Sequence, residues 1–397
     1  MDHKLRLYVY WPMLFVGLYI MAIYLFDDSE SLYLIANGIF FLLLFTILLA
    51  GVRFNFKPIT PEILLASYAG WITLSMVWAW DVSATGDDVV RQILFLCLWL
   101  GIVNVISRDR KYIVATLKWI VASGTILTLY LIAHYGFGSY LSAIYSGTRI
   151  GEDVLQLNKL GMYTSTAAIL SALFFLETKK IQYILFTLIP LLGMLGSGSK
   201  RAFLMFALSI ILYMLLKVQG QGQKYRVAKL LGGVFIFVGI MQLLMGSDIF
   251  GGVLGRFTEL HNTLESGDSH FSRMLFLQYG FQSFLNHPII GLGSGNSHAV
   301  TIAALGWKTY LHNNYMEQLV NLGIVGFILY YGVYFTILKR TFSLAKNNND
   351  TCARMVTILL LSQLISDIAV TSYNLKFTYV VFAIGIATAK LYHHKQV

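Results

Sequence analysis

The chain has 397 residues, of which 57% are hydrophobic and only 12% are charged, and its formal net charge at pH 7 is +10. Soluble proteins carry roughly 25% charged residues, so this composition excludes an ordinary soluble fold and indicates an integral membrane protein. The positive charge does not by itself indicate nucleic acid, because basic cytoplasmic loops are typical of membrane proteins. We expect no nucleic-acid partner. Cys97 and Cys352 form no disulfide framework and no metal pattern.

Long apolar runs predict an all-α, polytopic membrane protein, with residues 1–397 in a single transmembrane domain. A run of roughly 20 apolar residues spans a bilayer core of about 30 Å. The first run follows Lys4 and Arg6, is too long for the core of a cleavable signal peptide, and is expected to be a signal-anchor helix. The run 154–176 has a polar interior and is expected to face protein or a cavity. About twelve spans are predicted: 8–26, 32–51, 61–79, 89–107, 112–134, 154–176, 181–197, 201–217, 227–246, 314–338, 352–370 and 374–391.

Lysine and arginine placement predicts the orientation of these helices, because cytoplasmic loops are enriched in both residues. With a cytoplasmic N-terminus, the basic residues gather in every second connection. The alternate connections are acidic or neutral, beginning with 27–31 and 80–88. Lys390 and Lys395 agree with a cytoplasmic C-terminus. Both termini are therefore expected in the cytoplasm, and the long segment 247–313 on the outer face.

The longest polar interruption of the apolar pattern, His270–Gly326, is expected to carry the function. It begins with a predicted amphipathic helix that His287-Pro288 ends, since proline lacks the amide donor and clashes with the preceding turn. A glycine-rich turn with Gly291 and Gly293 follows, and a polar loop leads to His312. The apolar residues of the predicted helix repeat at helical spacing on one face: Met274, Leu277, Phe281, Phe284 and Leu285.

Several basic residues oppose the charge rule, because they fall at or near the predicted outer face. Some are expected to be ordinary loop charges or ion pairs, as Arg149 is beside Glu152 and Asp153. Others lie in apolar or amphipathic segments without a carboxylate close in sequence, and such cations suit an anionic ligand, phosphate above all for arginine. The Gly196–Arg201 turn also fits a tight hairpin whose cations touch lipid headgroups. The set is Arg91, Arg149, Lys159, Lys200, Arg201, Arg256, Arg273, Lys308 and Lys376.

Three landmarks occur in order along the chain. They are the turn Gly-Ser-Gly-Ser-Lys-Arg-Ala-Phe at 196–203, Arg273 followed by His-Pro-Ile-Ile-Gly-Leu-Gly at 287–293, and His-Asn-Asn-Tyr-Met-Glu, which opens the stretch 312–326. Together they resemble the O-antigen ligase and O-antigen polymerase family of bacterial membrane glycosyltransferases. The resemblance covers residues 160–340, and the first five helices match only in hydrophobic character.

This resemblance implies an inverting, metal-independent transferase that needs no cofactor. Arginines of the family are thought to hold the diphosphate of the donor, and a histidine to help deprotonate the acceptor. By position His312 is the catalytic residue, while Lys200 or Arg201 fills the place of a second family arginine. Glu317 is also expected near a helix N-terminus, where its negative charge interacts favourably with the helix dipole. The full expected substrate-binding set is Arg273, Lys200, Arg201, Lys159, Arg256, Asn313 and Glu317, with Gly291 and Gly293 as a structural turn.

The resemblance also implies a cellular location and binding partners. The place is the bacterial cytoplasmic membrane, with an outer-face active site capped by 247–313. The expected partners are an undecaprenyl-diphosphate-linked oligosaccharide donor, a glycan or lipid-linked glycan acceptor, membrane lipid, a chain-length regulator and a flippase. A repeat-unit polymerase is favoured over a ligase to lipid A-core, although no residue separates the two. The alternative class is a polyisoprenoid-glycan flippase or other transporter, which should show repeated halves and unwound helices, and neither is evident.

Overall fold

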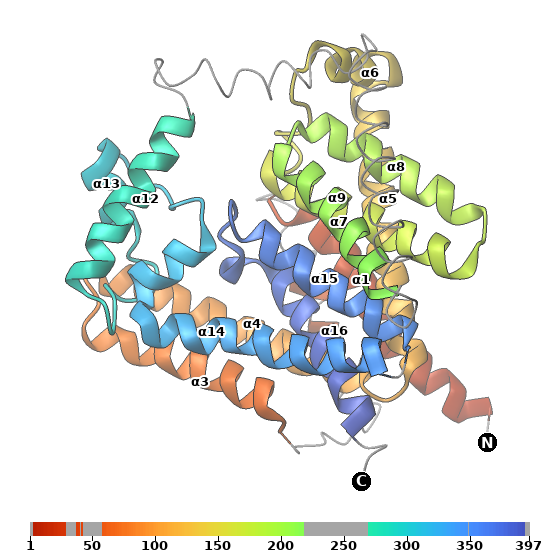
Figure 1. Cartoon of the computed structure of the whole chain (residues 1–397), viewed down its shortest axis with the longest axis horizontal. Coiled ribbons are helices and arrows are strands. Elements are labelled where there is room, and N and C mark those ends of the chain that lie inside the picture. Colours follow the sequence, from red (N-terminus) through yellow and green to blue (C-terminus); the bar gives the residue numbers. More distant parts are fainter. Residues whose placement is uncertain are drawn as a thin grey trace.

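The computed structural model describes residues 3–28, 37–39, 41–42, 58–217, 269–347 and 349–393. Every element in these ranges is helical, which confirms the all-α class (Figure 1). The α-helices are α1 His3–Phe26, α3 Thr60–Leu74, α4 Val82–Ile106, α5 Arg110–Tyr135, α6 Phe137–Ser146, α7 Leu157–Thr178, α8 Gln182–Ser197, α9 Lys200–Lys217, α12 Ser269–Asn286, α13 His298–Leu305, α14 Asn314–Asn347, α15 Thr351–Ser366 and α16 Lys376–His393. Two short 3-10 helices are η1 Ser75–Val77 and η2 Ser372–Asn374.

The helices agree with the apolar runs in the part of the chain that the structure describes. Four of them, α4, α5, α7 and α14, are long and apolar enough to cross a membrane. The predicted spans 32–51 and 227–246 lie wholly or largely outside the described residues, so the number of twelve spans stays a prediction. Two short helices, α6 and α13, were not predicted. They have 10 and 8 residues, too few for an apolar run long enough to cross a membrane.

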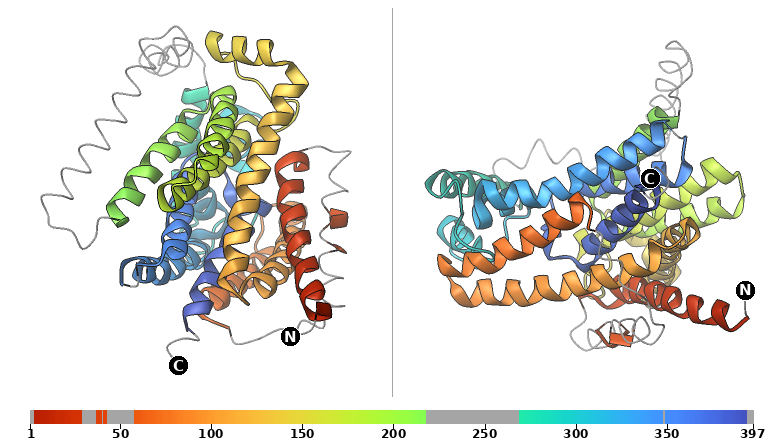
Figure 2. Two further views of the ribbon diagram at one scale, coloured as in Figure 1. Left: turned by 90° about the vertical axis from the view of Figure 1, so that its right-hand side faces the viewer. Right: turned by 90° about the horizontal axis from the view of Figure 1, so that it is seen from below.

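Helix α7 lies at the centre of one group of helices and packs against α5, α8, α9 and α15 (Figure 2). Small residues allow these close contacts, since a Cβ at Gly124 of α5 would lie 2.3 Å from the Cβ of Ala167. The hydroxyls of Thr164 and Thr166 are buried, and each donates to a backbone carbonyl one turn earlier. The expectation that this polar span faces protein is therefore confirmed.

A second group forms where α3 packs against α4 and α14, and α16 packs against the same two helices (Figure 1 and Figure 2). Ion pairs join the helix ends that the charge pattern predicts to lie at the cytoplasmic face of the membrane. The opposite helix ends meet around the segments 27–28, 156–158, 200–201 and 367–376. In the described part of the chain, successive loops thus alternate between the two ends of the helix bundle, and the side that faces the cytoplasm stays a prediction. The ion pairs are Arg110–Asp350 at 3.3 Å, Glu177–Lys217 at 3.4 Å, Glu177–Arg354 at 3.6 Å and Glu62–Lys390 at 2.6 Å.

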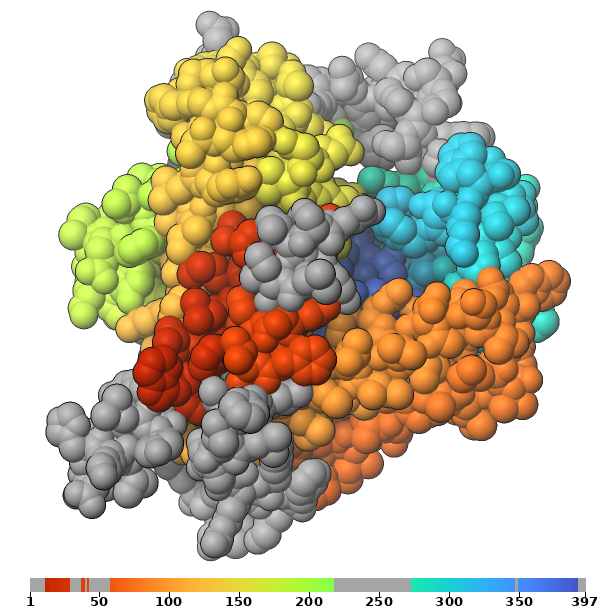
Figure 3. Space-filling view, turned by 180° about the vertical axis from the view of Figure 1, so that it is seen from behind, coloured from red at the N-terminus to blue at the C-terminus, as the bar shows by residue number. Residues whose placement is uncertain are grey.

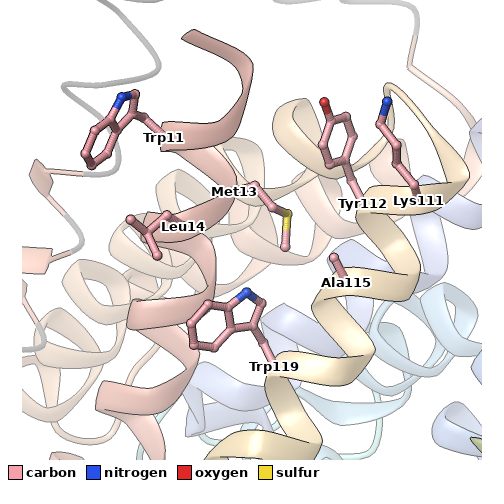
Figure 4. A pocket seen from close by; sticks show the side chains of 7 residues that line it. All are labelled: Trp11, Met13, Leu14, Lys111, Tyr112, Ala115 and Trp119. Carbon is pink, nitrogen blue, oxygen red and sulfur yellow. The ribbon is translucent and has the colours of Figure 1, made fainter. Parts of the chain in front are cut away.

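A cavity of about 550 Å3 lies between α1 and α5, near the end of the bundle that carries the Arg110–Asp350 pair (Figure 4). The indole of Trp119 extends from α5 toward α1, where Gly17 leaves room for it. A Cβ at Gly17 would lie 2.1 Å from that ring. This cavity is far along the bundle from the segments that carry the predicted site residues.

Candidate functional site

His312 lies in the loop between α13 and α14 with a left-handed backbone, at φ +55°. A residue with a Cβ adopts this conformation at a cost of roughly 1–2 kcal/mol. The imidazole stacks on Phe276 of α12, with 6.2 Å between ring centroids, and lies 4.0 Å from the ring of Tyr310. Its Nδ1 atom is buried and has no hydrogen-bond partner among the described residues. The ring is held between two aromatic side chains with one nitrogen unused.

Buried hydrogen bonds hold the backbone on both sides of His312. The carboxylate of Glu317 accepts from the backbone amide of Leu311 at 3.0 Å and from the hydroxyl of Ser297. Asn313 caps α14, because its Oδ1 accepts from the amide of Met316 at 3.0 Å. The observed role of Asn313 and Glu317 is thus to position the histidine loop. Their predicted contacts with substrate stay a prediction.

The loop is also tied to the segment after α15. The Nδ2 group of Asn313 donates to the carbonyl of Ile368 at 3.1 Å, and the amide of Asn314 donates to the carbonyl of Asp367 at 2.8 Å. The Nδ2 group of Asn314 donates to the carboxylate of Asp367 at 3.2 Å. These contacts fix the start of α14 against residues more than 50 positions later in the chain.

The glycine-rich turn docks onto a break in α14. Gly323 has a φ of 63° and a ψ of −166°, which interrupts the helix. The break leaves backbone carbonyls of α14 without their usual partners within the helix. The glycine-rich turn bonds to them, since the amide of Gly293 donates to the carbonyl of Asn321 at 2.8 Å. A Cβ at Gly291, where φ is +67°, would lie 2.5 Å from the backbone of Asn321. This close approach explains why the turn needs glycine.

Arg201 lies in the first turn of α9, and its charge acts on His312. Its Nη2 donates to the carbonyl of Asn158 at 2.7 Å. Its Nε and Nη1 are buried and have no hydrogen-bond partner in the described part of the chain. A buried charged donor without a partner is costly, by more than the roughly 1–3 kcal/mol of a neutral group. The guanidinium of Arg201 therefore has two donor atoms, Nε and Nη1, that can bind an anion.

Arg273, in the second turn of α12, completes the group around His312. Burial, followed by the positive charges of Arg273 and Arg201, lowers the pKa of His312 to about 4. The imidazole is therefore neutral at pH 7 and able to accept a proton. The structure brings together three predicted residues from separate elements. Of the neighbours Lys200 and Arg201, Arg201 is the one seen to act on the histidine.

Tyr310 belongs to the same site, although the sequence analysis did not identify it. Its hydroxyl accepts from the side-chain amide of Gln156, which precedes α7. Burial raises the pKa of this hydroxyl above its ordinary value. An aromatic residue two positions before His312 in a polar loop was the available signal. Tyr310 joins the histidine loop to the start of α7.

The remaining predicted cations lie differently. Lys159 forms ion pairs with Asp28 and, at 3.5 Å, with Asp27, so its charge is balanced by residues distant in sequence. Lys200 is the first residue of α9 and is partly exposed. Arg256 lies outside the described residues. Substrate contacts of these three residues stay a prediction. Within the described ranges, no group of three His, Cys, Asp or Glu side chains is placed to hold a metal ion.

One region of the chain is similar to a known protein family. Residues 185–331 match the family model described as O-antigen ligase. The matched range contains Arg201, Arg273, His312 and the glycine-rich turn. No curated protein matches the chain. The chain thus has helices apolar enough to cross a membrane, and its residues 185–331 are similar to the O-antigen ligase family.

Proposed function

We propose that the protein transfers a glycan from undecaprenyl diphosphate to an acceptor hydroxyl at the outer face of the bacterial cytoplasmic membrane. The observation that carries this proposal is the buried guanidinium of Arg201, whose Nε and Nη1 have no partner in the described structure. The planar guanidinium group matches two oxygens of a phosphate at once. Arg273 adds a second positive charge at the same place, as its effect on His312 indicates. Two arginines suit a diphosphate better than a single anion.

The reaction then proceeds as a single displacement. A ring nitrogen of His312 takes the proton of the acceptor hydroxyl while the acceptor oxygen attacks the anomeric carbon. The bond from that carbon to the diphosphate oxygen breaks, and the diphosphate leaves with the bonding electrons. Arg201 and Arg273 stabilise the charge that develops on it. Attack opposite the leaving group inverts the anomeric centre.

Substrate binding also prepares the base. The negative charge of the bound diphosphate offsets the two arginines, which in the free protein lower the pKa of His312. The pKa of the histidine is thereby raised toward the range in which a general base works best near neutral pH. His312→Ala is expected to lower kcat roughly a hundredfold or more. Donor binding, held by the arginines, should persist in this variant.

The proposed transfer is independent of a metal ion, because guanidinium groups meet the charge of the leaving group. The purified enzyme should therefore keep its activity in EDTA. Inactivation by EDTA that a divalent ion reverses would reject this part of the proposal.

Within the family we favour a repeat-unit polymerase over a ligase, on the overall appearance of the sequence. The test is the lipid-linked glycan that accumulates in a cell lacking the protein. Single repeat units on the outer face indicate a polymerase, and finished polymer on its lipid carrier indicates a ligase. Units that stay on the inner face would instead indicate a flippase and reject the transferase.

A further inference from the structure

The hydroxyl of Tyr310 carries a proton that no described residue accepts. Its oxygen accepts a hydrogen bond from the side-chain amide of Gln156, and this bond uses a lone pair of the oxygen rather than the proton. It is the one hydrogen bond that the hydroxyl makes among the described residues. The O–H group can therefore donate to a bound ligand.

Both partners of this hydrogen bond are fixed by their own neighbours. Thr309, which precedes Tyr310, is joined to the hydroxyl of Thr301 by two bonds, at 3.1 Å from its amide and at 3.0 Å to its carbonyl. The backbone amide of Gln156 donates to the carboxylate of Asp28 at 2.8 Å. The position of the phenol oxygen is thus set before any ligand binds.

The start of α7 supports Tyr310 and the arginine site together. Gln156 directly precedes this helix and bonds to Tyr310. Two residues later, the carbonyl of Asn158 accepts from Arg201 at 2.7 Å. One short segment therefore holds the Tyr310 hydroxyl and the Arg201 guanidinium at the same place.

Three cations surround the hydroxyl. Burial raises its pKa above the ordinary value, and the charges of Lys159, Arg273 and Arg201 oppose this rise because they lie close to the phenol oxygen. The net pKa stays raised, so the hydroxyl keeps its proton at neutral pH. A protonated hydroxyl among cations suits a negatively charged ligand, because hydrogen bonds to an ionised acceptor are the strong ones.

A cleft of about 550 Å3 gives a ligand access to the start of α7. It is lined by Lys159 and by residues of α1, α4 and the start of α16. Figure 3 shows the surface hollowed on this side, with the blue C-terminal part of the chain visible between α4, in orange, and the cyan segment that leads to α14. The cation group is therefore open to a substrate.

Tyr310 joins the proposed base to this cation group. Its ring lies 4.0 Å from the ring of His312, and its hydroxyl lies among the cations. In the proposed displacement the acceptor oxygen is at the base, and the leaving oxygen is held by the arginines. The tyrosine hydroxyl is thus on the side of the leaving group.

We infer that Tyr310 is a further catalytic residue, whose hydroxyl donates a hydrogen bond to the diphosphate oxygen that leaves the anomeric carbon. This assignment rests on the proposed function. The tyrosine keeps its proton throughout, and the hydrogen bond strengthens as the leaving oxygen gains negative charge. In the donor the same oxygen is bonded to the sugar and carries little charge. The hydroxyl therefore stabilises the transition state more than the bound donor.

The kinetic test is Tyr310→Phe, which removes the hydroxyl and keeps the ring. This variant should lower kcat roughly a hundredfold, the scale of one lost donor to a developing charge, and leave the KM of the donor unchanged. Its thermal unfolding temperature and the acid limb of its pH profile should stay as in the wild type, because the ring still packs on His312. Tyr279→Phe is the matched control, since Tyr279 is an exposed tyrosine of α12.

Tyr310→Leu separates the hydroxyl from the ring. If the ring only held His312 in place, Tyr310→Phe would keep near-wild-type kcat and Tyr310→Leu alone would lose activity. That result would overturn the inference.

Gln156→Leu tests the orientation of the hydroxyl. It should lower kcat roughly fivefold in the wild type, the scale of one net hydrogen bond, and have no further effect in the Tyr310→Phe background. An equal loss in both backgrounds would contradict the assignment, because Gln156 would then act without the hydroxyl.

Binding of inorganic pyrophosphate to the full-length protein, measured by calorimetry, separates this inference from the proposed function. Its terminal oxygens carry the charge that the leaving oxygen gains, so Tyr310→Phe should raise the Kd about tenfold, the scale of a hydrogen bond to a charged group. An unchanged Kd would overturn the inference and leave the transferase untouched. A Kd that depends on the hydroxyl in a protein without transfer activity would support Tyr310 as an anion ligand and reject the proposed function.

Discussion

The pH dependence of transfer is a direct test of His312 as the general base. Burial, followed by the charges of Arg273 and Arg201, lowers the pKa of His312 from 6.5 to about 4. A base must be neutral to accept a proton, so activity should be lost only as the pH falls toward 4. At pH 5 roughly nine-tenths of a histidine with a pKa of 4 is neutral, against roughly 3% with a pKa of 6.5. The two cases therefore differ about thirtyfold at that pH.

The assay measures kcat/KM of the purified enzyme from pH 4.5 to 8, because this ratio reports the groups of the free enzyme. Arg273→Gln removes one positive charge near the imidazole and should move the acid limb of the profile to higher pH, whatever its effect on the maximum rate. Lys308→Gln is the control, since Lys308 is an exposed cation of the same loop. A wild-type acid limb near pH 6.5 that Arg273→Gln does not move would refute the reasoning.

Three further predictions concern the arginine, the helix break and the topology. Arg273→Lys keeps the charge but loses the planar fork, so transfer activity should fall strongly at a normal protein level on immunoblots; near-wild-type activity of Arg273→Ala would contradict the site. Gly323→Ala should lower the thermal unfolding temperature, because the new Cβ would lie 2.2 Å from the carbonyl oxygen of Ile289 and the residue has a positive φ. The control is Gly332→Ala in the same helix, which should have little effect because its Cβ meets only the Leu64 side chain at 3.3 Å. In a chain without native cysteines, a cysteine in place of Lys308 should react with an impermeant thiol reagent on intact cells and one in place of Lys180 should not; the reverse would overturn the orientation.

Much of the candidate site could be predicted from the order of short motifs. The motifs indicated Arg273 and His312, and the structure brings the charge of Arg273 close enough to act on His312, while their roles in catalysis stay predictions. The choice between Lys200 and Arg201 could not be made, because adjacent residues at a helix start point in different directions. The roles of Asn313 and Glu317 also needed the structure. Their hydrogen-bond partners, such as Ile368 and Ser297, lie elsewhere in the chain.

The sequence alone determined the membrane class, the all-α fold, the approximate helix positions and the alternation of basic loops. These properties depend on local composition, since each apolar run is long enough to form its own helix in a bilayer. Tertiary structure decided which charges are balanced and which are not. Lys159 finds its carboxylates 131 and 132 positions away, while two donors of Arg201 find none among the described residues. It also decided the break in α14, because the apolar pattern continues through Gly323 and only the docked turn reveals why a glycine stands there. Such pairings join segments far apart in sequence, and no local pattern encodes them.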